Sequence, residues 1–276
     1  MNPHLPQPIA LSSLLASQFR NRQLIIEMTK RVVLGRYKGS AMGLLWSFLN
    51  PLFMLTVYTF VFSIVFKARW GLGEDENKTQ FAIVLFIGMI VHGLFAEVLN
   101  RAPNLILSNV NYVKKVIFPL DILPVITMGA ALFHCLISLL VLIVAFVVFN
   151  GYLYWTAIFL PLIFLPLIIL TLGFAWILAS LGVYLRDVGQ TIGIIMSITL
   201  FCSPVFYSVN SIPESFRPWL MLNPITFIIE QARQVFIFGH LPNWSGLGIY
   251  TVVALFIAWI GYAWFQKTRK GFANVL

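Results

Sequence analysis

The chain has 276 residues, of which 60% are hydrophobic and only 10% are charged. Soluble domains carry about 25% charged residues, so the composition excludes an ordinary soluble protein and predicts a protein embedded in a membrane. The formal net charge of +9 does not indicate a nucleic-acid partner, because the basic residues lie at the ends of apolar stretches, where they orient membrane proteins.

The N-terminal part is expected to lie on the membrane surface. Residues 1–13 are polar and proline-rich and lack the basic-then-apolar order of a cleaved signal peptide, so the first span is expected to direct insertion. Residues 13–38 mix apolar side chains with basic ones, which predicts an amphipathic helix along the inner surface. The alternative is a helix that only extends its lysines and arginines to lipid headgroups.

Six apolar stretches are long enough to cross a membrane, because about 20 residues at about 1.5 Å each cover roughly 30 Å of hydrocarbon. They lie near residues 43–66, 81–99, 122–149, 155–183, 188–207 and 245–265. Backbone polar groups cannot remain unpaired in lipid, so all six are expected to be helices. The sequence therefore predicts an all-α polytopic membrane protein, with residues 1–276 as a single membrane domain and 43–265 as its six-span part.

The distribution of lysine and arginine predicts that both termini lie in the cytoplasm. With six spans, 13 basic residues fall in inner segments and 5 in outer ones. The inner set is Arg20, Arg22, Lys30, Arg31, Arg36, Lys38, Arg101, Lys114, Lys115, Arg186, Lys267, Arg269 and Lys270, and the outer set is Lys67, Arg69, Lys78, Arg217 and Arg233. The basic stretch 267–270 ends inside, which requires an even number of spans.

One further apolar segment, residues 219–238, is about long enough to cross but holds Asn223, Pro224, Glu230 and Arg233. Two charges near its centre would be costly in lipid, and a crossing would move the basic tail outside. We therefore predict re-entrant helices in 208–240, which dip into the outer face and turn back. Irregular backbone at that depth is tolerated only beside protein or water, so a cavity or pore is expected nearby.

The chain lacks the motifs of common catalytic and cofactor sites. It contains no glycine-rich phosphate loop, no H-E-x-x-H, no C-x-x-C and no G-x-S-x-G. Its two cysteines, Cys135 and Cys202, lie in apolar stretches without metal-ligand spacing. We therefore expect no bound cofactor, no metal site and no enzymatic activity in this chain.

Two classes of function remain open at this point, a membrane enzyme and a proton-coupled carrier. A membrane enzyme acting on polyprenyl-linked sugars would need paired carboxylates, and the acidic cluster at 74–76 also suits a solvated hairpin tip. A proton-coupled carrier would need ionisable residues inside spans, for which His92, Glu97 and His134 are the candidates. Glu97 and Arg101, four residues apart, also suit an ordinary helix-surface ion pair. A lone mid-span histidine such as His134 is more often hydrogen-bonded between helices than part of a proton relay.

Four motifs in a fixed order carry a family resemblance. They are Arg36-Tyr37-Lys38-Gly39-Ser40 with Gly43-Leu44-Leu45-Trp46 and Asn50-Pro51-Leu52; Val113-Lys114-Lys115-Val116-Ile117-Phe118-Pro119 with Pro124; Leu185-Arg186-Asp187 with Ser203-Pro204-Val205 and Tyr207; and Pro213, Asn223-Pro224 and Arg233. Their order and spacing resemble the permease subunits of polysaccharide-export ABC transporters, the group that moves O-antigen, capsule and teichoic acid chains. The likeness runs from about residue 19 to residue 265.

The resemblance implies a homodimer around a central channel in the bacterial inner membrane. It also implies two copies of a separate ABC ATPase, which would bind the ATP and Mg, and a polysaccharide substrate linked to polyprenyl diphosphate. A cytoplasmic coupling helix that contacts the ATPase is implied between spans two and three, which corresponds to residues 102–118. The missing phosphate loop agrees with an ATPase on another polypeptide.

Three groups of candidate site residues follow. For ATPase coupling they are Val110, Tyr112, Lys114, Lys115, Val116 and Phe118, although such a segment also suits a helix resting on the membrane. For the carrier diphosphate they are Arg36 and Lys38, whose cations suit phosphate oxygens and also suit positive-inside anchoring. For the glycan channel they are Trp46, Phe53, Tyr58, Phe201, Phe206 and Tyr207, because aromatic rings stack on sugar faces as well as anchoring in lipid.

Overall fold

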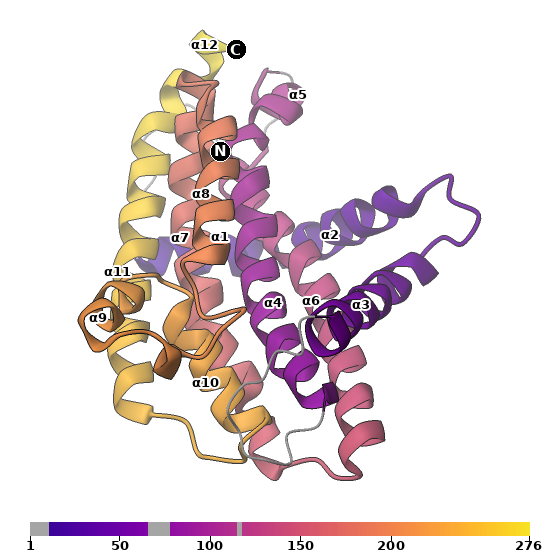
Figure 1. Cartoon of the computed structure of the whole chain (residues 1–276). Helices are drawn as coiled ribbons and strands as arrows, with labels where there is room; N and C mark the ends of the chain where they lie inside the picture. Colours follow the sequence, from indigo (N-terminus) through magenta and orange to yellow (C-terminus); the bar gives the residue numbers. More distant parts are fainter. Residues whose placement is uncertain (1–10, 66–77, 115–117) are drawn as a thin grey trace.

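The fold is a bundle of helices (Figure 1). The structure is a computed structural model that describes residues 11–65, 78–114 and 118–276. Within these ranges the regular elements are all helical and no strand occurs, so the predicted all-α class is confirmed. The α-helices are α1 Leu11–Arg20, α2 Arg22–Tyr37, α3 Leu45–Tyr58, α4 Lys78–Arg101, α5 Val110–Lys114, α6 Leu123–Asn150, α7 Leu160–Tyr184, α8 Val188–Phe201, α9 Arg217–Met221, α10 Thr226–Phe236, α11 Trp244–Thr268 and α12 Phe272–Val275.

Five helical stretches in the described ranges are long and apolar enough to cross a membrane. They are Leu45–Phe62, Gln80–Asn104, Leu120–Asn150, Trp155–Tyr184 and Trp244–Val275. These stretches coincide with the predicted spans one to four and six, so the predicted polytopic membrane architecture is confirmed. Four of them extend α4, α6, α7 and α11 by short 3-10 turns, the last one also including α12. The first continues α3 into the π-helix Thr59–Val65.

The fifth predicted span, residues 188–207, contains a shorter helix than expected. α8 ends at Phe201 after 14 residues, a length of about 21 Å against the roughly 30 Å of a bilayer core. Pro204 follows shortly after, and proline has no N–H and clashes with the preceding helical turn. α8 alone therefore does not reach across, and the count of six spans stays a prediction.

The first two helices run across the bundle, whereas the long helices run along it (Figure 1). The single helix expected over residues 13–38 is in fact two, α1 and α2, which meet at Asn21. α2 buries Val33 and exposes Lys30 and Arg31, but it also exposes Ile26 and Leu34, so its position on the membrane surface stays a prediction. It packs against α6, where Gly129 leaves room for Thr29: a Cβ on that glycine would lie 2.9 Å from the threonine hydroxyl oxygen.

The core is centred on α4, which packs against α3, α6, α7, α8 and α10. α7 and α11 form the most extensive helix pair. Where they cross, a Cβ on Gly261 would overlap the carbonyl oxygen of Gly173. Small residues at such a crossing allow two membrane helices to approach closely, so these glycines set the spacing of the pair.

The bundle has two distinct ends (Figure 1). α5, the turn between α7 and α8, and α12 lie at one end, whereas the connections from α6 to α7 and from α10 to α11 lie at the other. The predicted topology likewise places residues 102–118, 185–187 and 267–270 on one side. Which side of the membrane each end faces stays a prediction.

Residues 208–240 form short helices in place of a span. α9 has 5 residues and α10 has 11, and a turn at Asn223 and Pro224 separates them. α10 packs against α4 and α7 and buries most of its side chains. Neither helix is long enough to cross a bilayer, which agrees with the interpretation of this segment as non-crossing. Its dipping into the outer face stays a prediction.

Candidate functional site

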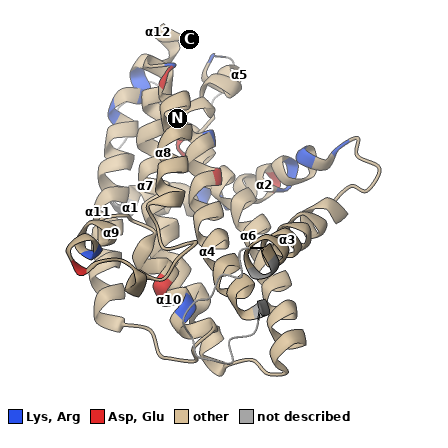
Figure 2. Cartoon of the chain, in the orientation of Figure 1, with Lys and Arg blue, Asp and Glu red and all other residues tan. Residues whose placement is uncertain are grey.

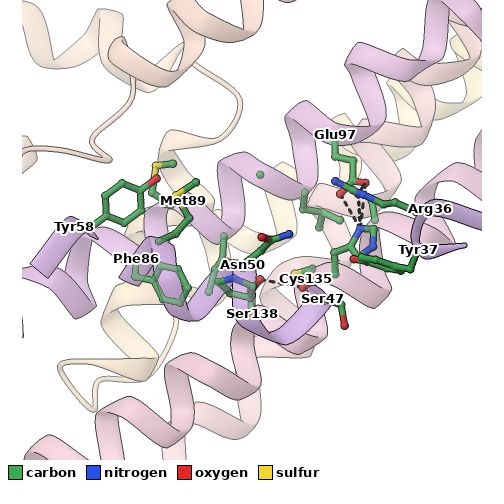
Figure 3. A pocket seen from close by; sticks show the side chains of 17 residues that line it. Arg36, Tyr37, Ser47, Asn50, Tyr58, Phe86, Met89, Glu97, Cys135 and Ser138 are labelled. Atoms are coloured by element: carbon green, nitrogen blue, oxygen red, sulfur yellow. Dashed lines mark hydrogen bonds and ion pairs between the residues drawn. The ribbon is translucent and has the colours of Figure 1, made fainter. Parts of the chain in front are cut away.

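A cavity of about 240 Å³ lies between the end of α2 and helices α3, α4 and α6 (Figure 3). Phe86 and Met89 contribute to its mostly apolar wall, and Ser47, Asn50 and Tyr58 contribute polar groups. A cluster of charged side chains lies at one end. A largely apolar cavity with a few converging polar groups is typical of a ligand site.

The charged cluster is centred on the Glu97 carboxylate of α4. Its Oε1 lies 2.8 Å from Nη1 of Arg36, 3.0 Å from Nη2 of Arg101 and 3.1 Å from Nδ1 of His134. The predicted pair between Glu97 and Arg101 is therefore confirmed, but it is one part of a cluster that also joins α2 and α6. Two guanidinium groups face one carboxylate, so the cluster keeps a net positive charge and suits an anion.

His134 reaches across from α6 to α4, as predicted for a histidine hydrogen-bonded between helices. Its Nδ1 also lies 3.1 Å from Nη1 of Arg36, so the Glu97 carboxylate and the Arg36 guanidinium compete for the same ring nitrogen. The Tyr37 ring meets the imidazole edge-on, with centroids 6.2 Å apart. Burial raises the pKa of the Tyr37 phenol above its usual value, so this side chain is neutral at physiological pH.

The two candidate diphosphate residues differ in their surroundings. Arg36 lines the cavity, and 47% of its side chain is exposed. Lys38 follows the end of α2 and is exposed outside the residues that line the cavity. The structure thus brings Arg36 together with Arg101, which was expected from the sequence only as the ion-pair partner of Glu97. Lys38 stays at the rim of the cavity.

The candidate channel aromatics fall into two groups. Phe201 stacks on Phe206 with centroids 5.8 Å apart, and Phe206 stacks on Phe62 at 5.7 Å. Phe62 in turn stacks on Phe81 at 5.8 Å, so four rings form a ladder from the end of α8 to the start of α4. At one end of this ladder, the hydroxyl of Tyr207 donates a hydrogen bond to the backbone carbonyl of Phe201.

The other three candidate aromatics lie on α3, which continues directly into the π-helix that carries Phe62. Tyr58 lines the cavity, Phe53 is 54% exposed, and Trp46 is half-buried. Of these three, only Tyr58 lines the cavity.

Arg233 is the most deeply buried charge in the described ranges, with 1% of its side chain exposed. It pairs with Glu230 at 2.9 Å and donates to the backbone carbonyls of Val84, Pro204 and Val205. The guanidinium thereby ties α10 to α4 and to the turn after α8. The motif set contains both Arg233 and the Ser203-Pro204-Val205 stretch, but their pairing depends on tertiary packing and was not predicted.

The coupling segment 102–118 is not one continuous helix. It consists of the 3-10 turns Ala102–Asn104 and Leu107–Asn109 followed by α5, and Pro103 at its start packs on Gly182 of α7. Candidate residues Lys115 and Val116 lie outside the described residues. Among the others, Lys114 is exposed, Val110 is half-buried, and Tyr112 stacks on the buried Phe118 at 4.4 Å.

The acidic cluster at 74–76, on which the membrane-enzyme alternative depended, also lies outside the described residues. Within the described ranges, no group of His, Cys, Asp and Glu side chains is arranged to hold a metal ion.

Comparison with known proteins identifies the family. The family model of ABC-2 type transporters matches residues 23–237. This chain belongs to the ABC-2 type transporter family. The match extends from α2 to the end of α10, so the cavity, the coupling segment and the Arg233 contacts of this ABC-2 protein all lie within it.

Curated relatives of this ABC-2 protein align over most of their length. The O-antigen export system permease protein RfbA of Myxococcus xanthus is 26% identical over 263 residues, which cover 95% of this chain and 98% of that protein. A protein of the same name from Klebsiella pneumoniae is 27% identical, covering 92% and 95%. The polysialic acid transport protein KpsM of Escherichia coli is 22% identical, covering 87% and 93%. The resemblance drawn from the four motifs is therefore confirmed.

Proposed function

We propose that this ABC-2 protein is the membrane permease of an ATP-driven exporter that moves a polyprenyl-diphosphate-linked polysaccharide, such as an O-antigen, across the bacterial inner membrane. The observation that carries the proposal is the match to the ABC-2 family over residues 23–237, together with near full-length relatives named for O-antigen export and polysialic acid transport. Both named cargoes are long glycans, so the shared chemistry is a polysaccharide.

The proposed assembly is a homodimer with two copies of a separate ATPase that carries the ATP and Mg. The absence of a phosphate loop in the sequence supports this division of labour. ATP binding on the partner would push the coupling segment 102–118 and move the helices attached to it, a rigid-body transmission between two sites. The packing of Pro103 against Gly182 supports this route, because it joins the coupling segment directly to α7.

The cationic cluster is the proposed site for the carrier diphosphate. Arg36 and Arg101 present two guanidinium groups against one carboxylate, and guanidinium groups bind phosphate oxygens in pairs. Lys38 at the rim would add charge that attracts the headgroup. The six candidate aromatics stay the proposed contact for the sugar chain, since ring faces stack on the apolar faces of sugars; they are Trp46, Phe53, Tyr58, Phe201, Phe206 and Tyr207.

The test is transport in proteoliposomes that contain this chain with or without its ATPase partner. Polyprenyl-diphosphate-linked glycan would be supplied on the ATPase side, and its arrival on the other side would be measured. We expect transport only when both subunits and ATP are present. ATP hydrolysis by this chain alone, or transport without the ATPase, would overturn the proposal.

A proton-coupled carrier is a second candidate, because the Glu97–His134 contact places ionisable groups within predicted spans. The same proteoliposomes distinguish the two functions. An uncoupler that collapses the proton gradient should leave ATP-dependent transport unchanged in an ABC exporter and should abolish transport in a proton-coupled carrier.

A further inference from the structure

The last residues of the chain pack against the coupling segment. After α11, the 3-10 turn Arg269–Gly271 leads into α12, and residues 269–276 are called the tail segment below. α12 packs against α5 and α7, and all three meet at the same end of the bundle (Figure 1). The tail segment and α5 are 155 residues or more apart in sequence, counted from Lys114 to Arg269, yet they form one surface.

The buried ring of Phe272 packs the tail segment against the helix bundle. Phe272 is fully buried and lies against the rings of Tyr184 and Phe265, with centroids 6.0 and 5.5 Å away. It belongs to the same apolar cluster as Val113 and Phe118 of the coupling segment. Burial of a phenylalanine contributes about 1.5–3 kcal/mol, so the tail segment is held in place by packing.

A buried ion pair also links the tail segment to the end of the coupling segment. Nη1 of Arg269 lies 3.8 Å from Oδ1 of Asp121, three residues beyond the coupling segment, and both side chains are under one tenth exposed. Asp121 also accepts a hydrogen bond from Ser17 of α1 at 2.7 Å, and its backbone carbonyl accepts one from Trp176 at 2.9 Å. Buried pairs gain little net stability because of desolvation, so we assign this one a positioning role.

The exposed residues of this surface include three lysines and one large apolar side chain. Lys114 of α5, Lys267 of α11 and Lys270 of the tail segment are exposed, and none of them has an ion-pair partner within the described ranges. Val275 of α12 is 50% exposed. Figure 2 shows basic residues at this end of the bundle, on both the C-terminal helices and α5.

We propose that the ATPase docks on a composite surface made of α5 and the tail segment, which the Asp121–Arg269 pair and Phe272 hold as one unit. The partner chemistry that fits is an apolar recess bordered by carboxylates, which would receive Val275 and face the three lysines. The proposal rests on the proposed function, in which a separate ATPase subunit binds this chain. It goes further in assigning the tail segment, and not only the coupling segment, to the docking interface.

The experiment measures the dissociation constant between the purified permease and its ATPase partner at low and high salt. Lys270→Glu should weaken binding about fivefold or more at low salt, and the difference should shrink at high salt, because screening removes the effect of exposed charges. Val275→Asp should weaken binding at both salt concentrations, because it introduces a charge into the apolar contact. Arg31→Glu, an exposed charge reversal on α2, is the matched control and should change binding less than twofold.

The outcomes separate the inference from the function on which it rests. Size-exclusion profiles and thermal unfolding of each variant, compared with the parent protein, verify that the exposed substitutions leave the fold intact. If the parent binds the ATPase and both tail variants stay within twofold of it, the tail segment is not part of the interface. If the parent itself binds no ATPase, the proposed function fails.

Discussion

A single buried side chain, Arg233, organises the region where α8 ends and α10 begins. Its guanidinium donates to three backbone carbonyls, one in α4 and two in the turn after α8. A buried charge is tolerated only when paired and hydrogen-bonded, and Glu230 supplies the pairing carboxylate. Arg233 therefore fixes α10 against α4.

Replacing Arg233 with methionine should be strongly destabilising. The variant keeps most of the side-chain volume but removes every donor and leaves Glu230 without its counterion. Loss of one partner of a buried pair costs about 3–5 kcal/mol, so the melting temperature of the purified protein in detergent should fall markedly. Lys30→Met is the control, because Lys30 and its carboxylate partner Glu27 are 62% and 69% exposed; the expected cost is about 1 kcal/mol or less. Equal shifts for the two variants would contradict the anchoring role.

At the cationic cluster, Arg36→Gln should lower ATP-dependent transport without preventing assembly with the ATPase. The substitution removes one of the two guanidinium groups around Glu97 and leaves a neutral cluster, which should bind a diphosphate more weakly. Arg36→Lys should restore part of the activity, since lysine keeps the charge but not the planar donor pair. Arg31→Gln on the same helix is the control. Transport by Arg36→Gln at the parental rate would remove Arg36 from the carrier site.

Among the elements, α7 and α11 form the most extensive helix pair, and substitution of the glycines of α11 tests how closely the two helices must approach. Gly261→Ala would push its Cβ into the carbonyl of Gly173, so the helices must separate, and overpacking of this kind typically costs about 1–3 kcal/mol. Gly248→Ala on the same helix meets no atom within 4 Å and should be neutral or slightly stabilising, because alanine favours helix. Thermal unfolding of both variants measures the difference.

The elements also show what the sequence can and cannot predict. Long apolar helices such as α6 and α11 were predicted correctly because their length and composition are local properties. The early end of α8 was missed, although Pro204 was visible, because the apolar run continues past it. The division between α1 and α2 left no clear local signal.

The candidate site was only partly predictable for a related reason. The Glu97–Arg101 pair lies within one helix and was expected from its spacing. The contacts of Arg36 with Glu97 and of Arg233 with Val84 join residues 61 and 149 positions apart. Such contacts follow from how the helices pack, and a single sequence does not contain that information.

For the whole molecule, Asp121 joins parts of the chain that would have to move together during transport. It lies at the exit of the coupling segment and contacts Ser17 of α1, Trp176 of α7 and Arg269 of the tail segment. A displacement of the coupling segment by the ATPase would therefore reach the surface helix α1 and the long helices α7 and α11 through one buried residue. Coupling between distant sites requires a physical element of this kind whose position both sites influence.

Asp121→Asn should therefore uncouple glycan transport from ATP hydrolysis by the partner. The asparagine can still accept the Ser17 hydrogen bond, and the backbone contact with Trp176 remains. Phe272 still packs the tail segment against the apolar cluster of the coupling segment, so the fold and ATPase assembly should survive. The attraction to Arg269 is lost, and the amount of glycan transported per ATP hydrolysed in proteoliposomes should fall severalfold while hydrolysis continues. Asp187→Asn is the control, because Asp187 is an exposed carboxylate in the α7–α8 turn at the same end of the bundle. A parental transport-to-hydrolysis ratio in Asp121→Asn would show that the coupling movement bypasses this junction.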